Sequence, residues 1–504
     1  GYPKYCPISR AEVPISYLSR GREIEGECDE AAMAVAIETA KKRCRAVIDR
    51  IESLPSSSSN ITISCKKTLL RLALSELSFL SRFSSSLPSN PNPNPSLSIN
   101  IGHLEAVVHI LQQPFINGVS RVCKPTPLSP AVKSAQRTNS SSERVHVDIV
   151  CTLNGNPVWF VVSDRNPKYI SWNGSCGNKG LRKRIKQVVD AAQSSLTMRP
   201  SSIILFFSNG LDDSVHVKLE DEFRTFDFGM EFSYFDFGFS EELEGEWINV
   251  LVRSYQQACI LEIKVGGSNN VTPRIECGVK DSLLDAARQD LSDEHIDLNL
   301  GGSFCSLVSE MRACSLDVKD LESVQPEGSS GEADLINLDT TVLIALVSGI
   351  SNGCTEKLLA TPESKLRRRF KSNFEFLITQ VMSEIQNPIH LELDGVISGK
   401  RGIICESVCS EFKELVSMCG GPNEKLRADH LIKSLMVVPD SPSARIMSLP
   451  TTRKLALKNK VVFGTGDYWH APTLTANMAF VRAISQTGMS LFTIEHRPRA
   501  LTGD

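Results

Sequence analysis

The sequence predicts a multi-domain α/β protein. Its 504 residues exceed what one hydrophobic core normally organises, since a domain takes roughly 150 residues. Apolar strand patterns alternate with helical patterns in two long stretches, which favours the α/β class. Two stretches of biased composition, one rich in Ser, Pro and Asn and one rich in acids, separate these parts. The expected organisation is a helical hairpin at 20–84, a linker at 85–98, a central α/β domain at 99–264, an acidic linker at 265–332 and a C-terminal α/β domain at 333–504.

Composition is that of a soluble globular protein, with 41% hydrophobic and 22% charged residues. The net charge of -3 provides no overall basic field, so nucleic-acid binding requires local patches. The 15 cysteines are scattered and form no CxxC pair, which disfavours a zinc ribbon or a thioredoxin-type redox motif. The sequence contains no run of 18 apolar residues, so we expect no membrane-spanning helix. We therefore expect a cytoplasmic or nuclear protein with reduced thiols.

The first part of the chain predicts two helices. Apolar residues recur at helical spacing over 29–53 and over 66–83, and the serine run Ser56–Ser59 separates the two patterns. We expect this helical hairpin to be a packing element or a docking element for a protein partner, without a catalytic role.

The central α/β domain is predicted from helix 103–111, strands 145–150 and 158–163, helix 181–195 and strand 203–207. Asp148 on a strand and Lys186-Gln187 on the following helix resemble the restriction-endonuclease-like fold. That fold places an acid-x-Lys motif on its second strand, whereas this chain has 163–166, Ser-Asp-Arg-Asn. The resemblance therefore implies a degenerate, non-catalytic platform for nucleic acid or protein.

Acidic residues follow apolar segments in the C-terminal domain. The run Leu335–Leu338 ends at Asp339, and a buried helix pattern follows it. Open α/β sheets bind ligands outside the carboxyl ends of their strands, which makes Asp339 a candidate site residue. The alternative is that Asp339 only caps the helix.

Two further segments repeat this pattern. Residues 402–415 predict a strand running into a helix whose first turns carry Glu411, with Glu406 and Glu414 as rivals. A solvated helix-face acid is the alternative for Glu411. Residues 461–467 predict a buried strand that ends in Asp467, with a tight turn at Gly466-Asp467 as the alternative.

Together these acids predict a metal site. Clustered carboxylates repel one another unless a cation is present. Mg²⁺ prefers oxygen ligands and activates water for attack on phosphodiesters, and Mn²⁺ is the alternative ion. The sequence thus predicts that Asp339, Glu411 and Asp467 hold a divalent cation and are the catalytic residues of a metal-dependent phosphodiesterase.

The order of these pieces resembles the PIN domain, an α/β nuclease fold. Its first strand ends in an Asp followed by a small polar residue, here Asp339-Thr340, and a strand–helix unit supplies an acid, here Glu411. A late strand ends in Thr-x-Asp, here assigned to Thr465-Gly466-Asp467. The resemblance implies an endoribonuclease that acts on single-stranded RNA, with Thr340, Thr465 and Asn477 as polar support.

A closer likeness is to an uncharacterised eukaryotic family of PIN-like proteins. It is carried by the stretches 438–442, 463–467, 474–483 and 498–502, and more weakly by 118–125 and the strand of Trp159.

One departure from the PIN pattern leaves a second function open. Active PIN domains supply another Asp at the start of the helix before the Thr-x-Asp strand, but residues 441–459 contain no acid. The alternative is therefore a catalytically inactive PIN-like module that binds RNA or protein. Arg367, Arg368 and Arg369 are candidate phosphate contacts, and their alternative is a solvated helix face. Aromatic residues at 468–470 are candidates for stacking on a base.

Overall fold

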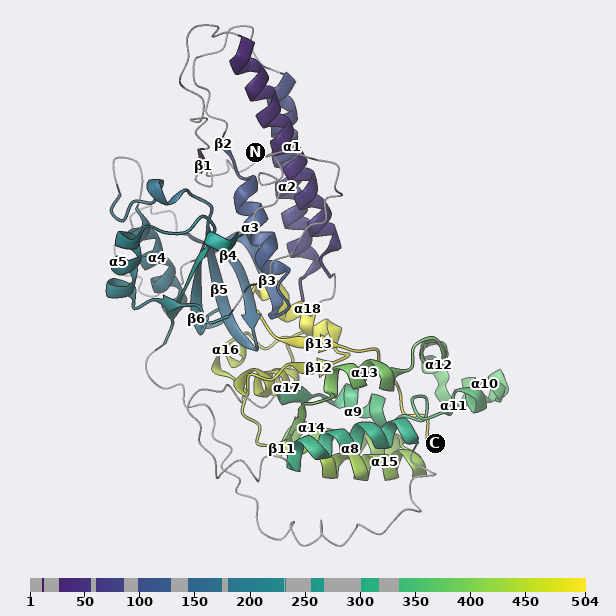
Figure 1. Cartoon of the computed structure of the whole chain (residues 1–504). Coiled ribbons are helices and arrows are strands. Elements are labelled where there is room, and N and C mark those ends of the chain that lie inside the picture. Colours follow the sequence, from purple (N-terminus) through teal and green to yellow (C-terminus); the bar gives the residue numbers. More distant parts are fainter. Residues whose placement is uncertain are drawn as a thin grey trace. The chain divides into compact units, whose positions relative to one another are not determined.

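The computed structural model describes residues 11–12, 27–55, 60–85, 98–127, 144–174, 180–230, 232, 255–266, 301–316 and 335–504 (Figure 1). The chain divides into two compact units, residues 1–266 with 488–490 and residues 267–487 with 491–504. Among the described helices, none combines the length and the apolar character that crossing a membrane requires.

The N-terminal unit begins with three packed helices, α1 (Glu27–Ser53), α2 (Ile63–Ser85) and α3 (Ile101–Leu111). The apolar spacing that predicts the hairpin also gives it a buried face, since Cys44 and Leu69 are fully buried. This face belongs to the same hydrophobic core as α3 and one face of the following sheet. The hairpin therefore packs as part of a larger unit.

The sheet of this unit is mixed and has the order β3-β4-β5-β6-β8-β7. Strands β3, β4 and β5 form an antiparallel meander, and β6 pairs parallel with β5 after the crossover helix α4. The second face of the sheet packs on α4 and α5. The strands are β3 (Ile116–Pro127), β4 (Arg144–Leu153), β5 (Asn156–Ser163), β6 (Ser202–Phe207), β7 (Phe226–Asp227) and β8 (Cys259–Lys264). The helices are α4 (Leu181–Ser194), α5 (Asp213–Phe223) and the 3-10 turns Pro167–Tyr169 and Tyr255–Gln257, and β1 (Ala11–Glu12) pairs with β2 (Ser98–Ile99).

The C-terminal unit is built on a five-stranded sheet in which every pair is parallel, with the order β11-β10-β9-β12-β13. The predicted α/β class with a parallel C-terminal sheet is thus confirmed. The chain builds outward from β9 through β10 to β11 and then returns to the other side of β9 with β12. The strands are β9 (Leu335–Leu338), β10 (Arg401–Cys405), β11 (Met436–Val438), β12 (Thr473–Thr475) and β13 (Thr493–Glu495).

Helices connect these strands (Figure 1). They are α9 (Thr340–Val347), α10 (Thr355–Ala360), α11 (Glu363–Phe370), the 3-10 turn Lys371–Asn373, α12 (Phe374–Gln386), α13 (Ile389–Ile397), α14 (Glu406–Cys419), α15 (Pro422–Ser434), α16 (Ala444–Met447), α17 (Leu457–Tyr468) and α18 (Met478–Thr487).

Part of the stretch predicted as an acidic linker is a packed helix, α8 (Gly302–Leu316). Phe304 and Met311 are buried, and α8 contacts α13, α15 and β10. The apolar face of α8 therefore belongs to the C-terminal unit. The short helix predicted near 283–291 and residues 86–97 of the predicted Ser/Pro/Asn linker lie outside the described residues.

The strand predicted over 461–467 is wrong, because this segment lies in helix α17. Its glycines allow close packing of the helix. A Cβ on Gly464 would lie 2.7 Å from the Cβ of Pro442, and one on Gly466 would meet Thr473 and Asn337. The strand of this region is β12, a few residues later.

Candidate functional site at the strand ends of the C-terminal unit

The carboxyl ends of β9 and β12 lie next to each other where the strand order reverses. Ligands of open α/β sheets bind in the crevice outside such a switch point. Asp339 follows β9 and Thr475 ends β12, and the Thr475 hydroxyl donates a hydrogen bond to Asp339 Oδ2. The residue that follows β9 and the last residue of β12 are therefore hydrogen-bonded to each other at this switch point.

Asp339 is buried and caps α9. Its Oδ1 accepts hydrogen bonds from the backbone N–H groups of Thr341 at 2.8 Å and Val342 at 3.2 Å, and it lies 2.5 Å from the Thr341 hydroxyl. Burial raises the pKa of Asp339 above its ordinary value, although these hydrogen bonds act in the opposite direction. Because both carboxylate oxygens are engaged inside the protein, the capping alternative describes what Asp339 does here.

His496, after β13, joins this network. Its Nε2 lies 3.1 Å from the Thr341 hydroxyl, and its Nδ1 lies 2.9 Å from the carbonyl oxygen of Arg497. Burial lowers the pKa of His496 to about 4, so the ring is neutral at pH 7. A neutral ring facing a carbonyl carries its proton on Nδ1, which places an unprotonated Nε2 next to the Thr341 hydroxyl. No motif in the sequence points to this residue, since His496 has no other histidine, cysteine or aspartate close to it in the C-terminal stretch 491–503.

Glu411 lies on α14, as predicted, and reaches the end of β9. Its Oε2 accepts a hydrogen bond from the Thr340 hydroxyl at 3.0 Å. Its Oε1 lies 3.1 Å from the ammonium of Lys458, in the first turn of α17. The structure therefore brings Glu411 and Thr340 together, with a cation from the chain itself beside the carboxylate.

Asp467 lies at the other end of α17 from Lys458. The two residues are nine positions apart, which corresponds to about 13.5 Å of helix. Its carboxylate forms a two-pronged ion pair with Arg445, with Nε at 2.8 Å and the second nitrogen at 2.5 Å. The side chains are 5% and 10% exposed, so this pair is shielded from solvent.

The predicted supporting residues also have structural partners. The buried Thr465 hydroxyl donates to the Val461 carbonyl at 2.9 Å and accepts from the Ser441 N–H at 3.2 Å. Asn477 follows β12 and accepts from the Phe480 N–H at 3.3 Å, which caps the start of α18. Thr465 thus ties a loop to α17, and Asn477 stands two residues after Thr475.

The structure does not bring the carboxylate oxygens of the three predicted acids within 4.8 Å of one another. In the part of the chain that the structure describes, the three potential ligands whose ligand atoms lie within 4.8 Å of one another are His103, Cys123 and Asp148 of the N-terminal unit. Asp339, Glu411 and Asp467 do not meet this condition, and each has its own partners.

The predicted arginines lie on α11 and are largely engaged within the unit. Arg367 pairs with Glu363 and Glu375 and stacks over Phe374, with its guanidinium 4.1 Å from the ring centre. Arg369 donates to the Thr502 carbonyl at 2.5 Å. Arg368 is exposed.

A second basic surface, which sequence analysis did not single out, lies at the start of α17. Ala456 occupies the N-cap without a side-chain hydrogen bond, and Arg453, Lys454 and Lys458 are exposed around it. We call these three residues the α17 basic cluster. A helix N-terminus carries a partial positive charge and unpaired N–H groups, which bind anions. The basic residues were visible in the sequence, but their position depended on the helix that replaces the predicted strand.

The C-terminal site lies in a stretch of the chain that matches a protein-family model. Residues 336–504 match a family model described as "Protein of unknown function (DUF1308)". The matched stretch begins in β9 and contains all the residues of the C-terminal site. No solved structure matches the chain.

Proposed function

We propose that the C-terminal unit is a PIN-like domain that binds single-stranded RNA without cleaving it. The observation that carries this proposal is the contact of the Lys458 ammonium with Glu411, 3.1 Å from Oε1. A divalent cation at Glu411 would have to displace this ammonium. Asp467, another of the three predicted ligands, is likewise paired with a cation of the chain, Arg445.

The strand order supports the PIN-like part of the proposal. PIN domains place acids after the first strand, at the start of the helix before a late strand, and in a Thr-x-Asp end of that late strand. In this chain the late strand is β12, which ends at Thr475 and is followed by Ala476 and Asn477, so Asn477 stands where an acid is expected. The preceding helix α17 has no acid in its first turn and carries Lys458 there. Two of the acids that would hold metal are thus replaced by an amide and an ammonium.

The α17 basic cluster favours RNA over a protein partner. Phosphate oxygens accept hydrogen bonds from the N–H groups of a helix start and attract nearby cations. Three exposed cations at an N-terminus without a side-chain cap therefore suit a phosphodiester backbone.

Binding of a fluorescently labelled single-stranded RNA to the full chain, followed by anisotropy across a range of salt concentrations, tests this proposal. Each phosphate contact contributes about -0.7 to the slope of log affinity against log salt for single strands. The double variant Arg453→Ala/Lys454→Ala should bind more weakly and show a slope smaller by about 1.4. Lys433→Ala, which removes an exposed lysine from the last turn of α15, is the matched control and should leave the slope unchanged. Equal slopes for the wild type and the double variant would contradict the proposed RNA surface.

A further inference from the structure

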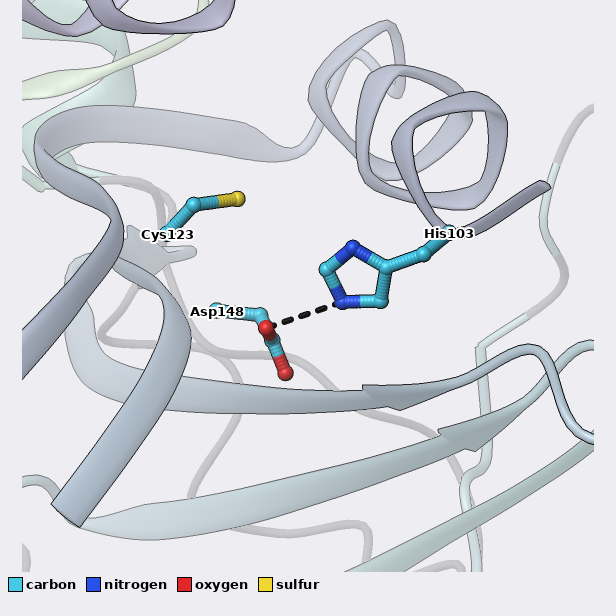
Figure 2. A group of neighbouring side chains, drawn as sticks. All are labelled: His103, Cys123 and Asp148. Carbon is cyan, nitrogen blue, oxygen red and sulfur yellow. Dashed lines mark hydrogen bonds and ion pairs between the residues drawn. The ribbon is translucent and has the colours of Figure 1, made fainter. Parts of the chain in front are cut away.

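Three side chains with metal-binding chemistry meet in the N-terminal unit, far from the C-terminal site in sequence. His103 comes from α3, Cys123 from β3 and Asp148 from β4. Their ligand atoms all lie within 4.8 Å of one another, and His103 Nε2 is 2.9 Å from Asp148 Oδ1. Figure 2 shows the imidazole and the carboxylate joined by this hydrogen bond, with the thiol of Cys123 beside them.

The ligand types and spacing suit Zn²⁺ better than Mg²⁺. A thiolate and an imidazole are borderline-soft ligands, whereas Mg²⁺ takes oxygen. Zinc binds sulfur at about 2.3 Å and nitrogen or oxygen at about 2.0 Å, so ligand atoms around a tetrahedral ion lie about 3.3–3.6 Å apart. The observed atoms lie within 4.8 Å of one another and reach this arrangement through shifts of roughly 1 Å, which small side-chain rotations supply.

Asp148 is held in place for such a role. Its Oδ2 accepts a hydrogen bond from the Val162 N–H at 2.7 Å, which leaves Oδ1 directed at His103. Arg184 lies 3.7 Å from the same Oδ2, so His103, Val162 and Arg184 surround the buried carboxylate with partners. A buried carboxylate is stable only when it is paired in this way.

Cys123 adopts a backbone conformation that is unusual for its residue type. Its φ is +46°, in the left-handed region that residues with a side chain seldom occupy. Strained conformations of this kind are concentrated at functional sites. The neighbouring residue Lys124 resumes regular pairing with Val147 of β4, so the strain is local and directs the thiol of Cys123 into the cluster.

A nearby cation is compatible with a bound ion. Arg184 of α4 lies 3.7 Å from Asp148 Oδ2, the oxygen that also accepts from Val162, and its side chain is 37% exposed. A doubly charged ion would be balanced by the Cys123 thiolate and the Asp148 carboxylate. Arg184 then keeps its contact with the second oxygen.

We propose that His103, Cys123 and Asp148 form a three-ligand site for Zn²⁺ or a similar thiophilic divalent cation. The ion ties α3 to β3 and β4. Three protein ligands around a tetrahedral ion leave a fourth position for water or for an external ligand.

Cobalt substitution in the full chain tests this site, because Co²⁺ bound to a thiolate absorbs in the near ultraviolet through charge transfer. The protein is stripped with a chelator and titrated with Co²⁺. The wild type should develop the band with one equivalent, and Zn²⁺ should abolish it. Cys123→Ser should lose the band, while Cys259→Ser, the matched substitution in β8 of the same unit, should keep it.

His103→Gln and Asp148→Asn complete the test, and the second retains an oxygen that can accept from Val162. Each should weaken Co²⁺ binding by tenfold or more, since even indirect partners of metal ligands contribute about 10–100-fold. Far-ultraviolet circular dichroism confirms that each variant is folded, and Zn²⁺ should raise the melting temperature of the wild type but not of these variants. The absence of a band in the wild type, or a band that persists in folded Cys123→Ser, would overturn the proposal.

Discussion

The ammonium of Lys458 lies 3.1 Å from Oε1 of Glu411, while the Thr340 hydroxyl donates to the other oxygen of the same carboxylate at 3.0 Å. The chain therefore provides its own cation at the position where sequence analysis predicted a metal ion. The consequences of this pairing, and of the buried network beside it, can be measured.

Lys458→Ala should change stability little and RNA binding clearly. Lys458 and Glu411 are 70% and 39% exposed, and ion pairs this accessible contribute about 0–1 kcal/mol. The free energy of unfolding in urea should therefore change by about 0.5 kcal/mol or less. The slope of log RNA affinity against log salt should become smaller in magnitude by about 0.7, as expected for the loss of one phosphate contact. A large loss of stability would instead assign Lys458 a structural role.

The ion pair Arg445–Asp467, unlike the pair Lys458–Glu411, should contribute strongly to the free energy of unfolding. Because both side chains are almost fully buried, Arg445→Met leaves a buried carboxylate without its partner. Removal of one member of such a pair costs about 3–5 kcal/mol. Urea denaturation of Arg445→Met, Asp467→Asn and the double variant measures this, and the double variant should be less destabilised than the sum of the two singles. Additive effects would show that the pair is not coupled.

Asp339→Ala should be much more destabilising than Asp339→Asn. Alanine removes the helix cap and the acceptor for the Thr475 hydroxyl, which together should cost about 2–3 kcal/mol. Asparagine caps a helix nearly as well as aspartate, so its cost should be about 1 kcal/mol. Thermal or urea unfolding of the two variants tests this order, and equal losses would contradict the capping role.

His496 should make the protein less stable in mild acid. Its folded pKa is about 4 and its ordinary value is 6.5, so the unfolded state binds more protons between these values. The stabilisation is complete above about pH 6.5 and is lost as the pH falls toward 4, by about 3 kcal/mol in all. Burial also lowers the pKa of His109 in the N-terminal unit to about 4. A variant of His496 alone is therefore needed to separate the two contributions. The free energy of unfolding of His496→Gln should depend less on pH between 7 and 5 than that of the wild type, and equal slopes would refute the assignment.

The sequence was most informative where periodicity and local chemistry agree. The run Leu335–Leu338 followed by Asp339 predicts both β9 and a capped helix, because strand, cap and helix signals are contiguous. The unit of β10 and α14 was predicted for the same reason, and in the structure Glu411 accepts a hydrogen bond from Thr340.

The sequence was misleading where tertiary packing decides. Val461, Val462 and Phe463 look like a buried strand, but glycines at 464 and 466 allow the helix α17 to approach Pro442 and Thr473 closely. The ion pairs of Lys458 and Arg445 could not be predicted, because their partners are 47 and 22 residues away in the sequence. Such pairings depend on the fold, and no local pattern reports them.

The proposed binding of RNA by the C-terminal unit, without cleavage, can be tested in one experiment. The most direct measurement incubates the full chain with labelled single-stranded RNA and Mn²⁺, and follows binding and cleavage in the same samples. We predict saturable binding with no cleavage beyond that of a protein-free sample, and no difference in cleavage between the wild type and Asp339→Asn. Manganese-dependent cleavage by the wild type that is lost in folded Asp339→Asn would refute binding without cleavage and restore the predicted nuclease.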